Sequence, residues 1–200
     1  MDFIKMDTTI HDVTVASQLI YDTEPALFSH LFGKNKDHAL SNIQKLIWVG
    51  NNSFGHDVIY LSMDTNNICG LTIIYMKDDI DKQVESKRFS ESLDLFSLLR
   101  LVFYEKTVIR RLLTTNHSKD ELYISNICVD EQYRGQGVGR FILENIVEHA
   151  KMRKCKTIVL DVSTDNEIAV SLYKKYGFVI IKKRALRFFK TMVYQMARTI

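Results

Sequence analysis

Residues 133–140 read YRGQGVGR, with glycines at positions 135, 137 and 139 between Arg134 and Arg140. The preceding run, ELYISNICV at 121–129, is typical of a buried β-strand, and apolar residues at helical spacing follow the glycines. A strand, a glycine loop and a helix in this order favour a layered α/β arrangement for the C-terminal half of the chain.

The start of this expected helix, near Gly137, has the features of an anion site. A helix N-terminus leaves about four backbone N–H groups unpaired, and glycines let a ligand approach them closely. No acid lies between Arg134 and Ile142, so this helix start suits an external anion. One alternative is a glycine turn that only packs the strand against the helix. Another is the dinucleotide fingerprint, but that motif reads GxGxxG and belongs to the first βα turn of its unit.

Strands and helices alternate through the rest of the chain, which predicts an α/β fold around a central sheet. Pro25 and the turn at 33–36 interrupt the helical N-terminal part. Strands are expected at 2–6, 58–63, 68–76, 121–129, 156–162, 177–181 and 188–196, and helices at 11–31, 37–49, 137–152 and 166–176.

The segment 78–120 carries a separate helical pattern, which predicts one long amphipathic helix or two shorter ones. Its apolar positions are Leu95, Leu98, Leu99, Val102, Ile109 and Leu113. Such an apolar face must be buried against the domain itself, an acceptor molecule or another copy of the chain in a homodimer.

Composition narrows the class of protein further. Two hundred residues with 46% hydrophobic side chains predict one globular domain spanning 1–200, or one domain with a large insertion. A net charge of +3 gives no reason to expect a nucleic-acid partner, and no apolar run is long enough to span a membrane. The odd count of three cysteines predicts reduced thiols in a cytoplasmic protein, and the six histidines form no metal-binding pattern.

Two motifs together resemble the GCN5-related N-acetyltransferase superfamily, abbreviated GNAT. RGQGVG at 134–139 is similar to that family's Gln/Arg-x-x-Gly-x-Gly/Ala loop, and residues 166–178 are similar to its N-x-x-A-x-x-L-Y-x-x-x-G-F signature. The match covers 121–196 closely, and its motifs most resemble ribosomal-protein N-terminal acetyltransferases. The resemblance implies a mixed, mostly antiparallel sheet of about six to seven strands flanked by helices. It also implies acetyl-CoA as cosubstrate without a metal.

The resemblance also implies which residues bind acetyl-CoA. The pyrophosphate would lie on the amides of the glycine loop, and a bulged strand would pair with the pantetheine arm. We place that irregularity at Ser125 and Asn126, which interrupt an otherwise apolar strand. The implied binding residues are Ile127, Cys128, Val129, Arg134, Gly135, Gln136, Gly137, Val138, Gly139, Arg140 and Asn166.

By similarity, Tyr173 is the acid that protonates the departing thiolate, and Asn166, seven residues earlier on the same helical face, binds the cofactor arm. Asp161 interrupts the apolar strand KTIVLDV and aligns with a proposed base of the family, acting through a water. A structural acid bonded to a loop is the alternative, and Glu121 is the second candidate for the base. The Cys128 thiol is interpreted as a buried strand residue and not as a nucleophile, because no histidine lies near it in sequence.

The predicted function is therefore direct transfer of an acetyl group to a primary amine, either a protein N-terminus or a small molecule. A non-catalytic acyl-CoA-binding module that signals through the inserted helix is the alternative from another class. A nucleotide-binding oxidoreductase is a weaker one. The basic runs at 151–156 and 182–190 are interpreted as solvated surface and are not assigned to the site.

Overall fold

The computed structural model describes residues 1–104, 118–186 and 191–200. In these ranges, seven strands form one sheet in the order β1-β2-β3-β4-β5-β7-β6. Only the β4–β5 pairing is parallel, so the predicted mixed, mostly antiparallel sheet is confirmed. The strands are β1 (Asp2–Lys5), β2 (Ile59–Asp64), β3 (Asn67–Met76), β4 (Glu121–Val129), β5 (Thr157–Ser163), β6 (Val179–Leu186) and β7 (Thr191–Thr199).

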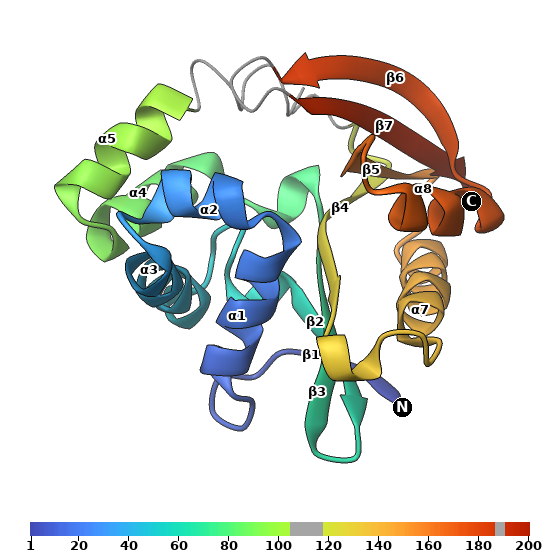
Figure 1. Ribbon diagram of the computed structural model, residues 1–200, viewed down its shortest axis with the longest axis horizontal. Helices are drawn as coiled ribbons and strands as arrows, with labels where there is room; N and C mark the ends of the chain where they lie inside the picture. The colour runs from blue at the N-terminus through green and yellow to red at the C-terminus, as the bar shows by residue number, and fades with distance from the viewer. Residues whose placement is uncertain (105–117, 187–190) are drawn as a thin grey trace.

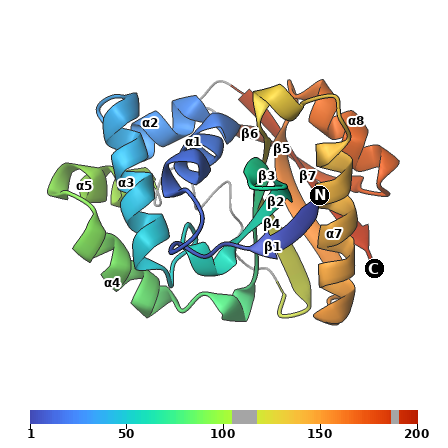
Figure 2. The ribbon, with the colours of Figure 1, turned by 90° about the horizontal axis from the view of Figure 1, so that it is seen from below.

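The helices lie on both sides of the sheet, with α1 to α5 on one face and α7 and α8 on the other (Figure 1); Figure 2 shows the same layers from below. The α-helices are α1 (Val13–Thr23), α2 (Pro25–Phe32), α3 (Lys36–Val49), α4 (Lys82–Ser92), α5 (Leu95–Tyr104), α7 (Val138–Met152) and α8 (Glu167–Lys175). Short 3-10 helices are η1 (His56–Val58), η2 (Lys77–Asp79) and η4 (Glu131–Tyr133).

The predicted helical stretch at 11–31 is two helices because of Pro25. Glu24 has φ −153° and ψ 70°, outside the helical region that a residue before proline disfavours. Pro25 then occupies the first turn of α2, where its missing N–H costs nothing. Asp12 caps α1 by accepting hydrogen bonds from the amides of Thr14 and Val15.

Two hydrophobic cores cover the two faces of the sheet. The core beneath α1 to α3 includes Ile20, Phe32 and Ile43, each with no exposed surface. The core beneath α7 and α8 contains alternate residues of β5, namely Ile158, Leu160 and Val162. Because side chains alternate along a strand, Asp161 lies on the α1 side of the sheet.

The segment between β3 and β4 contains α4 and α5, so the described part matches the alternative of two shorter helices. Leu98 packs against the core. Leu95, Leu99 and Val102 remain exposed by 68%, 58% and 47%. Only one side of α5 contacts the core, so burial against the domain itself does not hold for these three positions. Burial against an acceptor or another copy of the chain stays a prediction. Ile109 and Leu113 lie outside the described residues.

The C-terminal strands follow the prediction with shifted bounds. Gly177 has φ +79°, a left-handed turn that separates α8 from β6, so the strand expected at 177–181 begins at Val179. The strand expected at 188–196 is described from Thr191 onward, since 187–190 lie outside the described residues. Within the described ranges, no helix is long and apolar enough to cross a membrane.

Candidate active site

Strands β4 and β5 separate in the middle of the sheet. Their pairing ends at Ile124 and Leu160, although β4 continues to Val129 and β5 to Ser163. Among the described strands, the side of β4 that faces β5 therefore has no partner beyond Ile124. An extended ligand can pair with main-chain groups left open in this way.

The predicted irregularity in β4 is confirmed as a bulge at Ser125. Ile73 of β3 pairs with Asn126 and Ile74 pairs with Ile124, which leaves Ser125 as the extra residue. A bulge of this kind bends the strand and increases its local twist. It therefore accounts for the point at which β4 turns away from β5.

Side-chain hydrogen bonds hold the bulge in place. The Ser125 hydroxyl donates to Asn126 Oδ1 at 2.9 Å, and Asn126 Nδ2 donates to Thr23 Oγ1 at 2.8 Å. The Thr72 hydroxyl donates to the main-chain oxygen of Asn126 at 2.8 Å. Because Asn126 is 8% exposed, these bonds satisfy polar groups that would be costly to bury alone. They also fix the end of α1 against the bulge.

The glycine loop leads into α7 as predicted, and its glycines serve two purposes. Gly135 and Gly137 have φ of +77° and +86°, which favour glycine, and a Cβ at either position would meet nothing within 4 Å. Gly139 instead approaches α8, where its Cβ would lie 3.4 Å from Leu172. No acid occupies the first turn of α7, and Gly137 supplies no side-chain cap. The backbone amides of Val138, Gly139 and Arg140 donate to no described backbone group.

The polar side chains of the loop bind the protein's own groups. Arg134 Nε donates to the carbonyl of Val129 at 3.2 Å, and Gln136 Nε2 donates to the carbonyl of Gln132 at 2.8 Å. Arg140 pairs with Glu144 at 2.9 Å. The anion-binding capacity of the loop in this conformation therefore resides mainly in its backbone.

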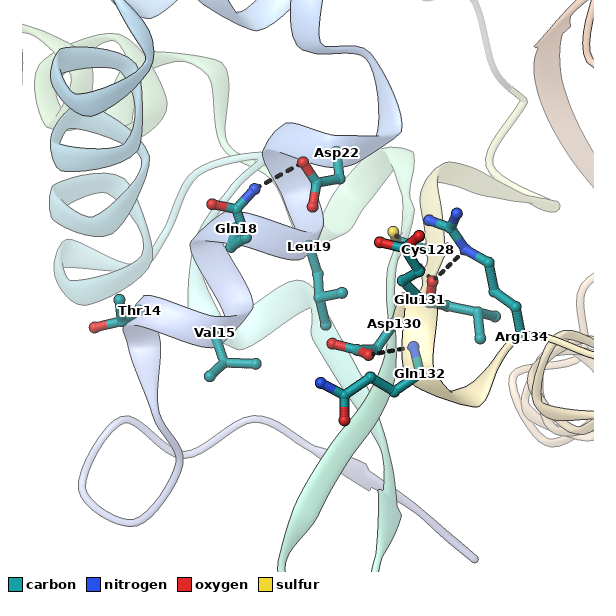
Figure 3. Close-up of a pocket in the computed structure, with 11 residues that line it drawn as sticks. Thr14, Val15, Gln18, Leu19, Asp22, Cys128, Asp130, Glu131, Gln132 and Arg134 are labelled. Carbon is teal, nitrogen blue, oxygen red and sulfur yellow. Dashed lines mark hydrogen bonds between the residues drawn. The ribbon is translucent and has the colours of Figure 1, made fainter. Parts of the chain in front are cut away.

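A cleft of about 540 Å³ lies between α1 and the end of β4, next to this loop; Figure 3 shows its lining. The lining residues are Thr14, Val15, Gln18, Leu19, Asp22, Cys128, Val129, Asp130, Glu131, Gln132 and Arg134. Burial raises the pKa of the Cys128 thiol to about 11. This thiol stays protonated at neutral pH, in keeping with its interpretation as a strand residue.

Asp161 directly follows Leu160, the last residue of β5 that pairs with β4, so it lies at the edge of the gap. Its Oδ2 accepts a hydrogen bond from the Tyr123 hydroxyl at 3.3 Å. Its Oδ1 is buried and accepts no hydrogen bond from any described residue. Burial raises the pKa of this carboxyl to about 6, against the opposing effects of the Arg184 charge and the Tyr123 hydrogen bond. The described structure shows no bond to a loop of the kind that a purely structural acid would make.

Tyr123 is a site residue that the sequence did not reveal. It lies on β4, and its ring packs at 5.7 Å from the ring of Tyr75 on β3. Burial and the nearby Asp161 carboxylate raise its pKa well above the ordinary value, so its hydroxyl remains a donor at neutral pH. The sequence shows only a tyrosine within an apolar strand. Its proximity to Asp161 cannot be inferred until the pairing register of β4 and β5 is known.

Tyr173 lies on the other face of the sheet from Asp161. It is 9% exposed, and its ring contacts Phe178 at 5.8 Å between centroids. Burial raises the pKa of its hydroxyl to about 12. No hydrogen bond joins this hydroxyl to a described residue, so the alternative of a core tyrosine satisfied elsewhere has no support there.

Asn166 lies just outside α8, because the helix expected at 166–176 begins at Glu167. Asn166 precedes the first helical residue as the N-cap of α8, and its Oδ1 accepts a hydrogen bond from the Ala169 amide at 3.1 Å. The shared face with Tyr173 stays a prediction for this capping position. The side-chain Nδ2 of Asn166 remains a donor at this exposed corner.

Glu121 lies at the opposite end of β4 from the bulge. It pairs with Thr157 in the closed part of the sheet, and its carboxylate accepts a hydrogen bond from the Ser118 amide at 3.0 Å. With a rise of about 3.3 Å per residue, four residues separate it from Ser125 by roughly 13 Å. The structure therefore brings Asp161 to the gap and leaves Glu121 away from it.

The separated strands and the glycine loop that leads into α7 define the acyl-CoA N-acyltransferase class of fold. The model of the Acetyltransferase (GNAT) family matches residues 53–178, which is more than half of the chain. The chain belongs to the GNAT family.

Individual relatives match shorter segments. The [ribosomal protein bS18]-alanine N-acetyltransferase of Escherichia coli K12 is 39% identical over 59 residues, which span 30% of this chain and 40% of that enzyme. The spermine/spermidine N(1)-acetyltransferase of Bacillus subtilis 168 is 31% identical over 64 residues, or 32% of this chain and 42% of that enzyme. The chain thus spans less than half the length of these curated relatives.

A solved structure resembles the chain over its whole length. The GNAT family acetyltransferase from Elizabethkingia anophelis, whose structure contains acetyl-CoA, has a TM-score of 0.60 with 16% identity. The likeness covers 100% of this chain and 97% of that one. At this identity it concerns the fold.

Proposed function

We propose that this protein is an N-acetyltransferase that moves the acetyl group of acetyl-CoA directly to a primary amine. The observation that carries the proposal is the separation of β4 from β5 after Ile124 and Leu160, beside a helix start whose first amides donate to no described backbone group. A main-chain edge for an extended arm and a helix start for a pyrophosphate are the two features that such a cosubstrate requires.

The residues present fit this cosubstrate. The backbone of β4 at Ile127, Cys128 and Val129 would pair with the pantetheine arm, and the amides from Gly135 to Arg140 would bind the pyrophosphate. The open space at Gly135 and Gly137 is where a side chain would obstruct the phosphates. Arg134, Gln136, Val138, Gly139 and Asn166 complete the proposed binding set, with Asn166 offering its Nδ2.

Bound acetyl-CoA supplies a thioester carbonyl for attack by the amine. An amine acceptor must first lose a proton, and Asp161 is the proposed base, directly or through a water. Its pKa of about 6 leaves it ionised at neutral pH while keeping it basic enough to take a proton. Its buried Oδ1, which is free of described hydrogen-bond donors, supports this role.

Tyr173 is the proposed acid for the departing thiolate. With a pKa of about 12, its hydroxyl is protonated at neutral pH and is unengaged by any described residue. Asp161 and Tyr173 lie on opposite faces of the sheet, on either side of the separated strands. One group can therefore accept the proton of the amine while the other donates to sulfur.

The acceptor is proposed to be a protein N-terminus or a small amine. The ribosomal-protein and polyamine enzymes named above act on one kind each. The single domain spanning 1–200, with its insertion at about 78–120, and a cytoplasmic location also remain proposals. Three free, buried cysteines support a reducing compartment.

The test is release of free CoA thiol from acetyl-CoA in the presence of a panel of amines and short peptides. Tyr173→Phe should lower turnover at least about a hundredfold, the lower end of the effect of general acid catalysis, while acetyl-CoA affinity stays within about twofold of wild type. Tyr176→Phe is the matched control, because its hydroxyl bonds Glu144 on the surface. Equal turnover in wild type and Tyr173→Phe would remove Tyr173 from the mechanism. Acetyl-CoA binding without turnover of any acceptor would refute the enzyme and favour the binding module.

A further inference from the structure

The register of β5, β7 and β6 aligns a charged residue of β5 with charged residues of β6, across uncharged residues of β7. Asp161 pairs with Gln195, and Gln195 pairs with Lys182 on its other side. In the next row of the same face, Val193 pairs with Ser163 on one side and with Arg184 on the other. Because directly paired residues project to the same face of a sheet, Lys182 and Arg184 share the face of Asp161.

This is the side of the sheet on which α1 to α5 lie, and not the side on which α7 and α8 lie (Figure 1). Tyr194, between the two rows in β7, packs with the α7 and α8 core. Lys183 lies with it, since its Nζ is 5.5 Å from the Tyr194 ring centroid. The basic run 182–184 is thus divided, and only its first and third residues share the face of Asp161.

The two cations on this face differ in exposure. Lys182 is exposed, and it makes no ion pair with a described residue. Arg184 is half-buried, and its charge acts on both Asp161 and Tyr123, where it opposes the rise in pKa that burial causes. An amine that reaches Asp161 therefore meets its carboxylate first and has the Lys182 and Arg184 side chains farther along the same face. A purely cationic acceptor would be repelled there unless it also carried a negative group.

The spacing of the strands sets where that negative group must lie. Neighbouring strands are about 4.8 Å apart, so β6 lies roughly 10 Å from β5. An extended chain advances about 3.3–3.6 Å per residue. An acidic side chain on the second or third residue of a peptide can thus reach β6 when the N-terminal amine is at Asp161.

We propose that the acceptor is a peptide N-terminus with Asp or Glu at its second or third position, whose carboxylate binds Lys182 and Arg184. This inference rests on the proposed acetyltransferase function and selects one of its acceptor classes. Polyamines are excluded as preferred acceptors, because every further amine of such a molecule would face the cations of β6.

The experiment compares acceptors that differ only in charge. Short peptides with Ala, Glu or Lys at positions two and three, together with spermidine, are assayed for CoA release with the wild-type protein. Wild type should acetylate the Glu peptides with a kcat/KM at least about fivefold above the Lys peptides, carried by KM, as expected for charge pairs at a partly exposed site. Lys182→Glu should reduce or reverse this preference.

Lys183→Glu is the matched control, with the same charge change on the opposite face, and it should keep the wild-type preference. Equal kcat/KM for Glu and Lys peptides, or an equal effect of the two substitutions, would overturn the inference while leaving the acetyltransferase function standing. Turnover of spermidine alone would overturn it in the same way. Failure of every acceptor despite acetyl-CoA binding would instead refute the proposed function itself.

Discussion

Replacing Asp161 by Asn tests two effects of this carboxylate separately: the loss of stability caused by its burial, and its proposed role as a base. Burial raises its pKa from 3.8 to about 6, and one pKa unit corresponds to about 1.4 kcal/mol. The ionised carboxylate therefore destabilises the folded protein by up to about 3 kcal/mol at neutral pH. Asn has the same shape and can still accept the hydrogen bond from Tyr123, but it carries no charge.

The sign of the pH dependence follows from the raised pKa. Between about pH 4 and about pH 6 the folded protein holds the Asp161 proton more tightly than the unfolded chain does, so this group makes stability fall as pH rises. Above about pH 6 its contribution is constant and unfavourable. At about pH 7.5, the free energy of unfolding of Asp161→Asn should therefore exceed that of wild type by about 1–3 kcal/mol, and its urea midpoint should be higher. At about pH 4 this difference should disappear.

Urea unfolding at several pH values measures this difference, and the pH profile of kcat/KM measures its functional counterpart. Wild-type kcat/KM should fall as pH drops through about 6, and the variant should lose both activity and that limb. Asp78→Asn, which removes an exposed carboxylate paired with Lys119, should change stability by less than about 1 kcal/mol. An Asp161→Asn protein that is less stable than wild type at neutral pH would refute the reasoning.

Two further substitutions test neighbouring parts of the site. Tyr123→Phe removes a hydrogen bond that lowers the pKa of Asp161, so the limb of the kcat/KM profile should move to higher pH; an unmoved limb would show that this bond does not tune the base. Gly137→Ala forces a Cβ onto a residue with φ +86° in open space, so it should cost about 1–2 kcal/mol of stability and weaken acetyl-CoA binding measured by calorimetry. Retained affinity would contradict the assignment of the loop.

Local chemistry explains what the sequence predicted correctly. Alternating glycines have few uses other than left-handed turns and close approach, and both appear at Gly135, Gly137 and Gly139. The polar pair Ser125 and Asn126 was similarly informative, because polar groups inside an apolar strand need partners or an irregular backbone. These features are encoded within a few residues, so no long-range contact is needed to predict them.

Contacts between distant segments could not be predicted in this way. Tyr123 and Asp161 are 38 residues apart, and their hydrogen bond depends on the parallel register of β4 and β5, which neither strand specifies alone. The start of α8 was misjudged by one residue, because sequence alone does not separate an N-cap Asn from a first helical residue. Leu95 and Leu99 are exposed because the core contacts a different side of α5, and the sequence of α5 alone does not specify which side that is.

The pKa of Asp161 results from opposing effects that arise on different strands. Burial on β5 raises it, while the Arg184 charge from β6 and the Tyr123 hydroxyl from β4 lower it. Without these partners the carboxyl would remain protonated to higher pH and be a poorer base at neutrality. Arg184 on β6 can therefore act twice, by keeping Asp161 ionised and by selecting an acceptor with a negative charge. The two roles separate experimentally, because exposed Lys182 should affect only selection, whereas Arg184 should affect both selection and the pH profile.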